Sequence, residues 1–427
     1  MQDHPQATGW ARPFFTIWTG QAFSLLGSKV AQFALIWWLT DRTGSATVLA
    51  TASLVGLIPE IALGPLAGAY VDRWDRRIVM IVADAAIALA SLCLAYLFWV
   101  DAIQTWHVYA IMFVRAVGGS FHWPAMQAST SLMVPKEQLT RVAGMNQTLN
   151  GSLNVFGAPL GALLMSLLPM HGVMMTDVGT AALAIAPLFF VPIPQPRRAA
   201  VGEDLSKKQS IWADIRDGLR YVLAWPGLLI LTGVAMVFKI VLTPAFSLVP
   251  LLVKDHFGGT AAQLGMLEAV VGGGSIAGGL ALSLWGGFRK KIYTIGLGVV
   301  GFSLAFLTWG IIPGDLFWVA VIGGAVVGLM IPLVDGPLMA ILQSTIAPEM
   351  QGRVLTLFGS LIWITSPLGL AMAGPISDRL GLQIWYSAAA VLSLLSGMVF
   401  FAIPAARDIE ENANGDQLRP LAAADSV

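Results

Sequence analysis

Long apolar stretches recur through this sequence of 427 residues, from residue 14 to residue 404. A helix that crosses the hydrocarbon core of a bilayer needs about 20 consecutive, mostly apolar residues. Charged residues make up only 11% of the chain, whereas soluble domains contain about 25%. The pattern therefore predicts an all-α integral membrane protein with twelve transmembrane helices, at residues 14–40, 47–70, 78–100, 105–133, 142–168, 173–192, 225–253, 260–285, 292–312, 315–346, 353–376 and 381–404.

The second apolar stretch ends in a cluster of charges, GPLAGAYVDRWDRR at residues 64–77. Cationic residues that flank membrane spans stay on the cytoplasmic side. If the N-terminus is placed there, eighteen of the 24 Lys and Arg residues fall in cytoplasmic segments. We therefore expect a multi-pass protein of the plasma (inner) membrane with both termini in the cytoplasm. The first residues lack the basic-then-apolar pattern of a cleaved signal, so the first span is expected to remain.

A polar interval divides the chain between the sixth and seventh spans. We predict an N-terminal six-helix half at residues 1–192, a cytoplasmic linker at 193–224, a C-terminal six-helix half at 225–404 and a disordered cytoplasmic tail at 405–427. Residues 124–142 and 337–354 share two prolines eleven residues apart and a later Arg-Val pair, so the halves look like copies of one unit. Parallel repeats of six spans are a transporter architecture, with the substrate site between the halves.

The linker itself has helical periodicity. Trp212, Ile215, Leu219 and Val222 follow one another at intervals of three or four residues, which predicts an amphipathic helix. Two interpretations are open: the helix lies on the inner leaflet, or it packs against the cytoplasmic ends of the spans.

The charged end of the second span suggests a cytoplasmic latch motif, formed by Gly68, Asp72, Arg73, Arg76 and Arg77. Glycine allows another helix to approach closely, and an aspartate at a helix end pairs with arginine or caps a neighbouring helix. Such a cluster holds the cytoplasmic ends of two halves together in one state and releases them in another. The alternative is that the arginines only anchor the topology.

Ionisable residues inside spans are costly, so we expect them to be functional. Glu60 lies about 18 Å along the helix from Asp72, near the middle of the membrane, and is the first candidate for a proton carrier. Arg115 in the fourth span needs a carboxylate or carbonyl groups at its depth, and Glu60 is the nearest acid by depth. The alternative is a static ion pair.

The second half offers a second proton-coupling candidate, Asp335, between Pro332 and Pro337. Each proline removes a helical hydrogen bond, so we expect a broken helix with an acid at the break. Lys239 and Glu268 are the remaining proton-coupling candidates, and we expect Lys239 to neutralise either Asp335 or Glu268. Three other charged residues in the spans are Lys29, Asp84 and Asp177. We expect Asp84 to reach the inner surface or to pair with the loop arginines, and Asp177 to be a structural helix cap.

The whole chain resembles the major facilitator superfamily, and within it the drug:proton antiporter branch that contains macrolide-efflux and enterobactin-exporter-like proteins. Residues 64–77 match the superfamily motif after span two, and the copy at residues 286–291 keeps the cations but has Gly286 in place of the acid. Residues 244–259, 210–223 and 134–147 resemble segments of that branch. The resemblance implies that residues 115–119, RAVGG, form the proton-coupling motif of span four.

Span five resembles the antiporter motif of exporters. Gly151, Gly157, Pro159 and Gly161 keep its glycine spacing and its proline, but Ala158 stands where the family has the glycine of the Gly-Pro ending. Close helix contact together with a proline bend would seal or hinge the cavity.

Aromatic and polar residues elsewhere in the spans are candidates for the wall of a large amphipathic cavity. For each of them, contact with lipid or a place in the interfacial aromatic belt is the competing interpretation. These cavity candidates are Gln21, Trp37, His122, Gln127, Asn146, Asn150, Phe156, Phe238, Phe246 and Trp363.

These observations predict a proton-coupled secondary transporter that exports hydrophobic or amphipathic compounds by alternating access. One alternative is an exporter of an endogenous metabolite, siderophore or lysolipid, and another is a non-transporting membrane receptor or assembly partner. We expect no enzyme activity, no metal site and no cofactor, since the proton gradient supplies the energy. The lone Cys93 excludes a disulfide within the chain. The expected partners are a small-molecule substrate and the lipid bilayer, without nucleic acid, and the protein is expected to be a monomer.

Overall fold

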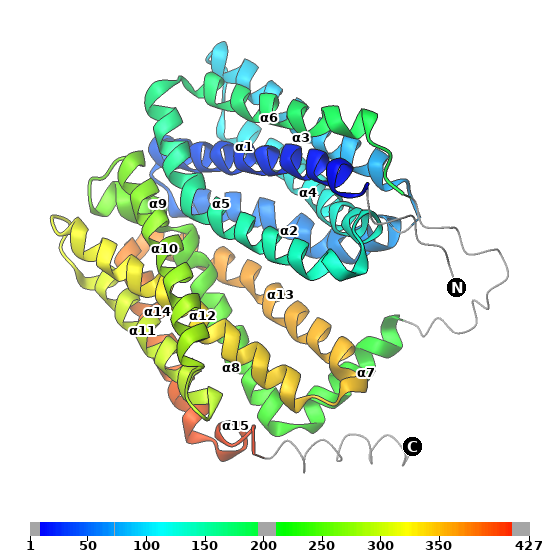
Figure 1. The fold of residues 1–427 in the computed structure, drawn as a ribbon. Helices are drawn as coiled ribbons and strands as arrows, with labels where there is room; N and C mark the ends of the chain where they lie inside the picture. The colour runs from blue at the N-terminus through cyan, green and yellow to red at the C-terminus, as the bar shows by residue number, and fades with distance from the viewer. Residues whose placement is uncertain (1–8, 72, 195–210, 412–427) are drawn as a thin grey trace, which may run out of the picture. The chain divides into compact units, whose positions relative to one another are not determined.

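The computed structural model describes residues 9–71, 73–194 and 211–411, and within these residues the chain is helical, without strands (Figure 1). Twelve of the described helices contain 21 to 33 residues. Each lies at one of the spans predicted from the apolar stretches. In the first part of the chain they are α1 (Ala11–Thr43), α2 (Ala46–Val71), α3 (Arg76–Trp99), α4 (Thr105–Met133), α5 (Leu139–Leu167) and α6 (Met170–Phe190).

The second part of the chain contains the other six long helices and several short ones. The long helices are α8 (Pro226–Ser247), α10 (Ala261–Trp285), α11 (Lys291–Ile311), α12 (Phe317–Thr345), α13 (Pro348–Leu380) and α14 (Leu382–Ala402). The shorter elements are η1 (Lys136–Gln138) in the first part and α7 (Ile211–Ala224), α9 (Val249–Leu251), η3 (Leu252–His256) and α15 (Pro404–Arg407) in the second.

Ten of the described helices are long and apolar enough to cross a membrane by length and composition. The two long helices outside this group, α4 and α5, have 29 residues each. Their apolar character is diluted by internal polar side chains, among them Arg115 and His122 in α4 and Asn150 and Asn154 in α5.

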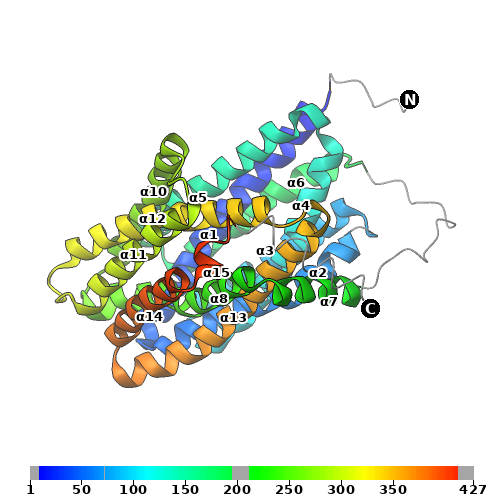
Figure 2. The same ribbon diagram turned by 90° about the horizontal axis from the view of Figure 1, so that it is seen from below.

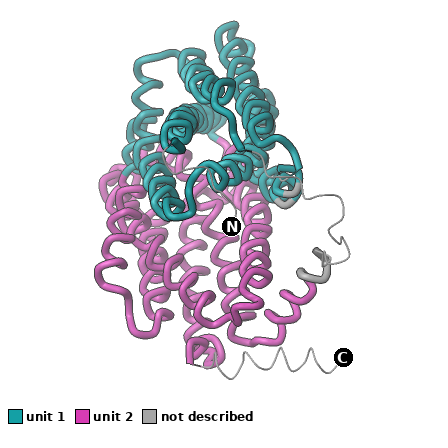
Figure 3. Tube along the Cα trace, turned by 45° about the vertical axis from the view of Figure 1, so that its right-hand side comes forward, with its two compact units in different colours: residues 1–44, 51–199, 259–269 teal, residues 45–50, 200–258, 270–427 magenta. Residues whose placement is uncertain are grey.

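The chain divides into two compact units (Figure 3). Unit 1 comprises residues 1–44, 51–199 and 259–269, and unit 2 comprises residues 45–50, 200–258 and 270–427. Two of the long helices are divided between the units. The first five residues of α2 group with unit 2, and the first nine residues of α10 group with unit 1.

Unit 1 is built on close contacts between α1 and α6, with α3 packed on α4 and α6. Small residues permit the first of these contacts. A Cβ at Gly20 would lie 2.8 Å from the backbone oxygen of Leu183, closer than a real side chain tolerates. The sequence of α1 therefore fixes its distance from α6.

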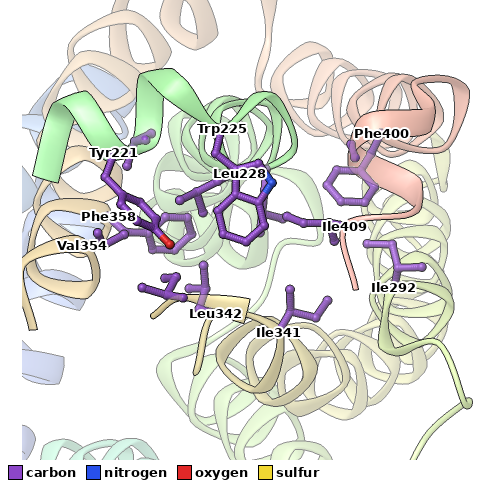
Figure 4. Packing of buried hydrophobic residues seen from close by; sticks show 14 residues of the cluster. Tyr221, Trp225, Leu228, Ile292, Ile341, Leu342, Val354, Phe358, Phe400 and Ile409 are labelled. Carbon is purple, nitrogen blue, oxygen red and sulfur yellow. The ribbon is translucent and has the colours of Figure 1, made fainter. Parts of the chain in front are cut away.

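Unit 2 packs α11 against α12 and α14, and α13 against α8, as both ribbon views show (Figures 1 and 2). A buried apolar cluster joins α7, α8, α13 and α14 (Figure 4). Trp225 is fully buried at its centre, with Tyr221, Leu228 and Phe358 around it. This cluster holds the linker helix to unit 2.

The linker helix α7 packs on α13 and α8. Tyr221 and Val222 are buried, and Asp217 lies 3.4 Å from the Arg353 guanidinium at the start of α13. Of the two interpretations of the linker, the structure favours packing against the ends of the spans. The side chains of Trp212 and Ile215 lie outside the described residues.

Two sequence-based expectations about unit 2 are wrong. The helix α12 continues unbroken through Pro332 and Pro337, because a proline removes a single backbone donor and helices packed in a bundle tolerate that loss. The prediction of a disordered tail also fails for residues 405–411. There α15 and the following turn are ordered, with Ile409 buried against the apolar cluster and Lys290 within 2.9 Å of Glu411.

Candidate functional site

The helices of unit 1 enclose a cavity of about 270 Å³ that we call the polar cavity. Nine polar or charged residues from α1 to α4 line it together with a few apolar ones, and six of the nine were singled out in the sequence. These six are Gln21, Lys29, Glu60, Asp84, Arg115 and His122. The polar cavity therefore brings together residues that the sequence singled out separately.

Arg115 pairs with Asp177 of α6, not with Glu60 as the depth argument suggested. The Asp177 side chain is fully buried, and that of Arg115 is 12% exposed. Ser91 donates to the same carboxylate at 2.6 Å, and Ser28 donates to its other oxygen at 3.0 Å. Asp177 is thus the counterion of Arg115, and its expected role as a helix cap is wrong.

Asp84 is buried and lies away from the loop arginines, contrary to expectation. Gln21 donates to one of its oxygens at 2.9 Å. His122 Nε2 lies 3.3 Å from the other oxygen, although it is not aligned for a hydrogen bond. Gln21 and His122, predicted to line a cavity, do so and also hold Asp84 in place.

Glu60 projects into the polar cavity and is exposed to solvent there. Lys29 of α1 interacts electrostatically with Glu60 and also with Glu268 of α10. Glu268 was expected to meet Lys239, but it lies in a small polar pocket of about 190 Å³ in unit 1, which Lys29 and Asn154 also line. One lysine therefore faces two carboxylates that the sequence did not connect.

The glycine-spaced run of α5 packs against α1 and the start of α10. A Cβ at Gly161 would lie 2.7 Å from the Phe33 ring, and one at Gly157 would lie 3.2 Å from Lys29 Cβ. Gly265 of α10 approaches Ala158. Gly151, by contrast, has no described atom within 4 Å of its Cβ position. The predicted close contact holds for the second half of the motif, which ends around Pro159.

Unit 2 contains a cavity of about 520 Å³ that we call the aromatic cavity. It lies among α8, α11, α12, α13 and α14, and most of its wall is apolar or aromatic. Three predicted cavity residues line it, Phe238, Phe246 and Trp363. Pockets that bind drug-sized molecules have volumes of about 300–1,000 Å³ with a few polar groups among apolar walls, so the aromatic cavity has the size and composition of a ligand site.

Asp335 and Lys239 are the charged groups in the wall of the aromatic cavity. They interact electrostatically, and Lys239 Nζ lies 4.0 Å from the centre of the Trp363 ring. Of the two acids considered as partners for Lys239, the structure selects Asp335.

The remaining cavity candidates line neither of these cavities. Asn146 accepts a hydrogen bond from Trp18 at 2.8 Å, and Phe156 is 58% exposed. Trp37 and Asn150 are half-buried, and Gln127 is exposed. Cys93 is exposed as well.

The latch motif is only partly described, because Asp72 lies outside the described residues. Arg76 donates to the backbone oxygen of Ala128 at 3.0 Å, and Arg77 donates to that of Phe189 at 2.7 Å. Arg73 is exposed. No described atom lies within 4 Å of a Cβ at Gly68.

The sequence analysis missed Asp378 near the end of α13. Its carboxylate accepts hydrogen bonds from the backbone nitrogens of Ala46 and Thr47, at 2.7 and 3.0 Å, and from the Ser45 hydroxyl at 2.9 Å. It therefore caps the N-terminus of α2. The signal was present: residues 374–379, GPISDR, repeat the Gly-x-x-x-Asp-Arg spacing of residues 68–73.

Within the described residues no cluster of three His, Cys, Asp or Glu side chains is arranged to hold a metal ion. The charged groups of both cavities belong to membrane-spanning helices that enclose a ligand-sized space. Charged groups within spans that line an internal space are typical of membrane transport proteins.

The chain belongs to the major facilitator superfamily, whose family model matches residues 17–361. It is 34% identical to Macrolide efflux protein A of Streptococcus pyogenes, over 92% of this chain and 95% of that protein. It is 25% identical to the multidrug efflux pump Tap of Mycobacterium bovis, over 96% of this chain and 98% of that protein. Among solved structures, a mutant of the nucleoside transporter NupG has the same fold, with a TM-score of 0.68 at 12% identity over 90% of this chain and 99% of that one.

Proposed function

We propose that this protein is a proton-coupled exporter of amphipathic compounds, including macrolide-type drugs, in the plasma membrane. The observation that carries the proposal is the difference between the two cavities. The polar cavity of unit 1 concentrates titratable groups, whereas the aromatic cavity of unit 2 offers an apolar wall with one acid and one base. Relatives named for macrolide and multidrug efflux support export as the direction.

In this proposal the proton is carried in unit 1. Arg115 and Asp177 neutralise each other. Gln21 donates a hydrogen bond to Asp84, and His122 lies next to its carboxylate. Lys29 remains as the cation that faces both Glu60 and Glu268. Because one cation cannot fully balance two carboxylates, a proton on one of them completes the charge balance.

Glu60 is exposed to water in the polar cavity, so it exchanges protons with solvent. Glu268 lies on the part of α10 that groups with unit 1. A change in the position of α10 would separate Glu268 from Lys29 and leave Lys29 to Glu60 alone. Proton binding and conformation are linked in this way, without a cofactor, and the proton gradient supplies the driving force. The proposed arrangement is a monomer with both termini in the cytoplasm.

The test uses full-length protein reconstituted in phospholipid vesicles and a radiolabelled macrolide. An imposed pH gradient should drive its accumulation, and a protonophore should abolish it. Glu60→Gln should remove the gradient-driven flux while leaving equilibrium binding of the macrolide unchanged. The matched control is Glu349→Gln at the exposed start of α13, which should transport like the wild type.

Wild-type flux that does not respond to the pH gradient would refute proton coupling. Flux in Glu60→Gln equal to that of the wild type would remove Glu60 from the mechanism, while leaving export itself intact.

A further inference from the structure

The half-buried Lys239 of the aromatic cavity lies against an aromatic ring. Its ammonium nitrogen, on α8, lies 4.0 Å from the centre of the Trp363 ring on α13. A cation over the face of a tryptophan is attracted by the negative face of the ring. This is also the geometry by which proteins bind the ammonium groups of ligands.

The negative charge near this ammonium is not paired with it directly. Asp335 of α12 interacts electrostatically with Lys239, but within the described residues no ion pair shorter than 4.0 Å joins the two. Asp335 is exposed at the cavity wall. The ammonium therefore contacts an aromatic face and interacts with a carboxylate only at longer range, so no direct ion pair would have to break for it to leave the ring.

The rest of the cavity provides a place for a large apolar group. Phe238 and Phe246 of α8 line it, and their rings make edge-on contacts with Phe302 and Phe306. A ligand with aromatic or macrocyclic carbon on one side and a single positive charge on the other would fit the wall and the charged end together.

We propose that Lys239 is an internal competitor that occupies the cation position of the cargo site. An amphipathic amine or quaternary ammonium displaces it from the Trp363 ring and binds between that ring and Asp335. The four-carbon stem of lysine is flexible, so its ammonium can leave the ring without a change in the helix backbone. The use of this cavity for cargo rests on the proposed function, whereas the competition is a property of binding alone.

The proposal predicts that removal of a positive charge improves the binding of a cation. Lys239→Gln frees the face of Trp363 and removes the repulsion between Lys239 and an incoming cation. Affinity for a cationic ligand should then rise about tenfold, the factor expected from one partly desolvated cation–π contact. If the cavity instead binds anions through Lys239, the same substitution should weaken binding.

Two probes of nearly identical shape separate these cases: the cation tetraphenylphosphonium and the anion tetraphenylborate. Equilibrium binding is measured on the purified full-length protein in detergent, without a gradient. In Lys239→Gln, tetraphenylphosphonium should bind about tenfold more tightly and tetraphenylborate more weakly. Lys239→Arg, which keeps a cation able to stack on Trp363, should bind tetraphenylphosphonium as the wild type does.

The matched control is Lys136→Gln, which removes a positive charge from an exposed position and should leave both affinities unchanged. In a Trp363→Leu background, Lys239→Gln should give only a small gain, because the ring that the probe would occupy is absent. Lys239→Met is a second neutral variant, and it should reproduce the gain.

Unchanged or weaker tetraphenylphosphonium binding in folded Lys239→Gln and Lys239→Met would overturn the proposal, as would a similar gain in Lys136→Gln. Vesicle transport is tested separately. If the protein fails to transport but shows the predicted gain in affinity, the proposed function is contradicted and the competition by Lys239 is supported. If the protein transports but shows no gain in affinity, the competition is contradicted and the proposed function is supported.

Discussion

The ion pair between Arg115 and Asp177 allows a quantitative test of what holds unit 1 together. Both side chains are buried, with exposures of 12% and 0%. Removing one partner of a buried pair costs about 3–5 kcal/mol, because the remaining charge stays without a counterion. Asp177→Asn keeps the shape of the side chain and an oxygen for Ser28 or Ser91, but it leaves the Arg115 guanidinium uncompensated. We therefore expect a loss of about 3–5 kcal/mol in the free energy of unfolding.

The assay is denaturant unfolding in mixed micelles, which yields the unfolding free energy from the transition midpoint and slope. Arg115→Gln should be destabilising to a similar degree. The double variant should be more stable than the sum of the two losses predicts, by about 1–3 kcal/mol, because neither charge is then left alone. The matched control is Asp101→Asn in an exposed loop. The backbone φ of Asp101 is 53°, which asparagine adopts readily, so its stability should be unchanged.

Two results would refute this reasoning. If Asp177→Asn is no less stable than Asp101→Asn, the carboxylate is not the counterion of Arg115. If the two losses at residues 115 and 177 add without an interaction, each side chain acts independently, as the helix-cap interpretation of Asp177 requires.

Two further predictions concern the helix contacts and the C-terminal segment. Gly161→Ala should lower the unfolding free energy by about 1–3 kcal/mol, because its Cβ would meet the Phe33 ring at 2.7 Å. Gly151→Ala should raise the unfolding free energy by up to about 1 kcal/mol, because the Cβ position at Gly151 lies in open space. Denaturant titration of both variants checks this. The hydrogen bonds from Arg407 and from Lys290 hold the pKa of Asp408 below its usual value of 3.8. The Lys290 contact, at 3.4 Å, ties residues 404–411 to the start of α11. Docking of this segment is therefore supported above the usual pKa and lost as the pH falls through the lower one. Hydrogen exchange of this segment should therefore stay slow as the pH is lowered to the usual value and rise only below it, and in Arg407→Gln the rise should begin at higher pH; an identical pH profile in both proteins would contradict the assignment.

The positions of the long helices were predictable from the sequence because a bilayer imposes a minimum apolar length on each span. The predicted span at residues 105–133 has the bounds of α4, and that at 260–285 begins one residue before α10. Local patterns also located much of the site, since Glu60, Arg115, His122 and Gln21 all line the polar cavity.

The pairing of the buried charges was not predictable in the same way. Counting residues along a helix gives the depth of a side chain in the membrane, but not the direction in which it points. Arg115 was therefore assigned to Glu60, an acid at a suitable depth, instead of to Asp177 on α6. Glu268 was assigned to the second half for the same reason, because the sequence does not indicate that the start of α10 packs with α1 and α5.

The cap that Asp378 places on α2 has a mechanical consequence. It fastens the first turn of that helix to α13 through three hydrogen bonds, and Gly374 permits the approach, since a Cβ there would lie 2.7 Å from Thr47 Cα. The same helix continues past Ala50 into the other unit. A displacement of one unit would therefore require either that these hydrogen bonds break or that α2 bends just beyond Ala50.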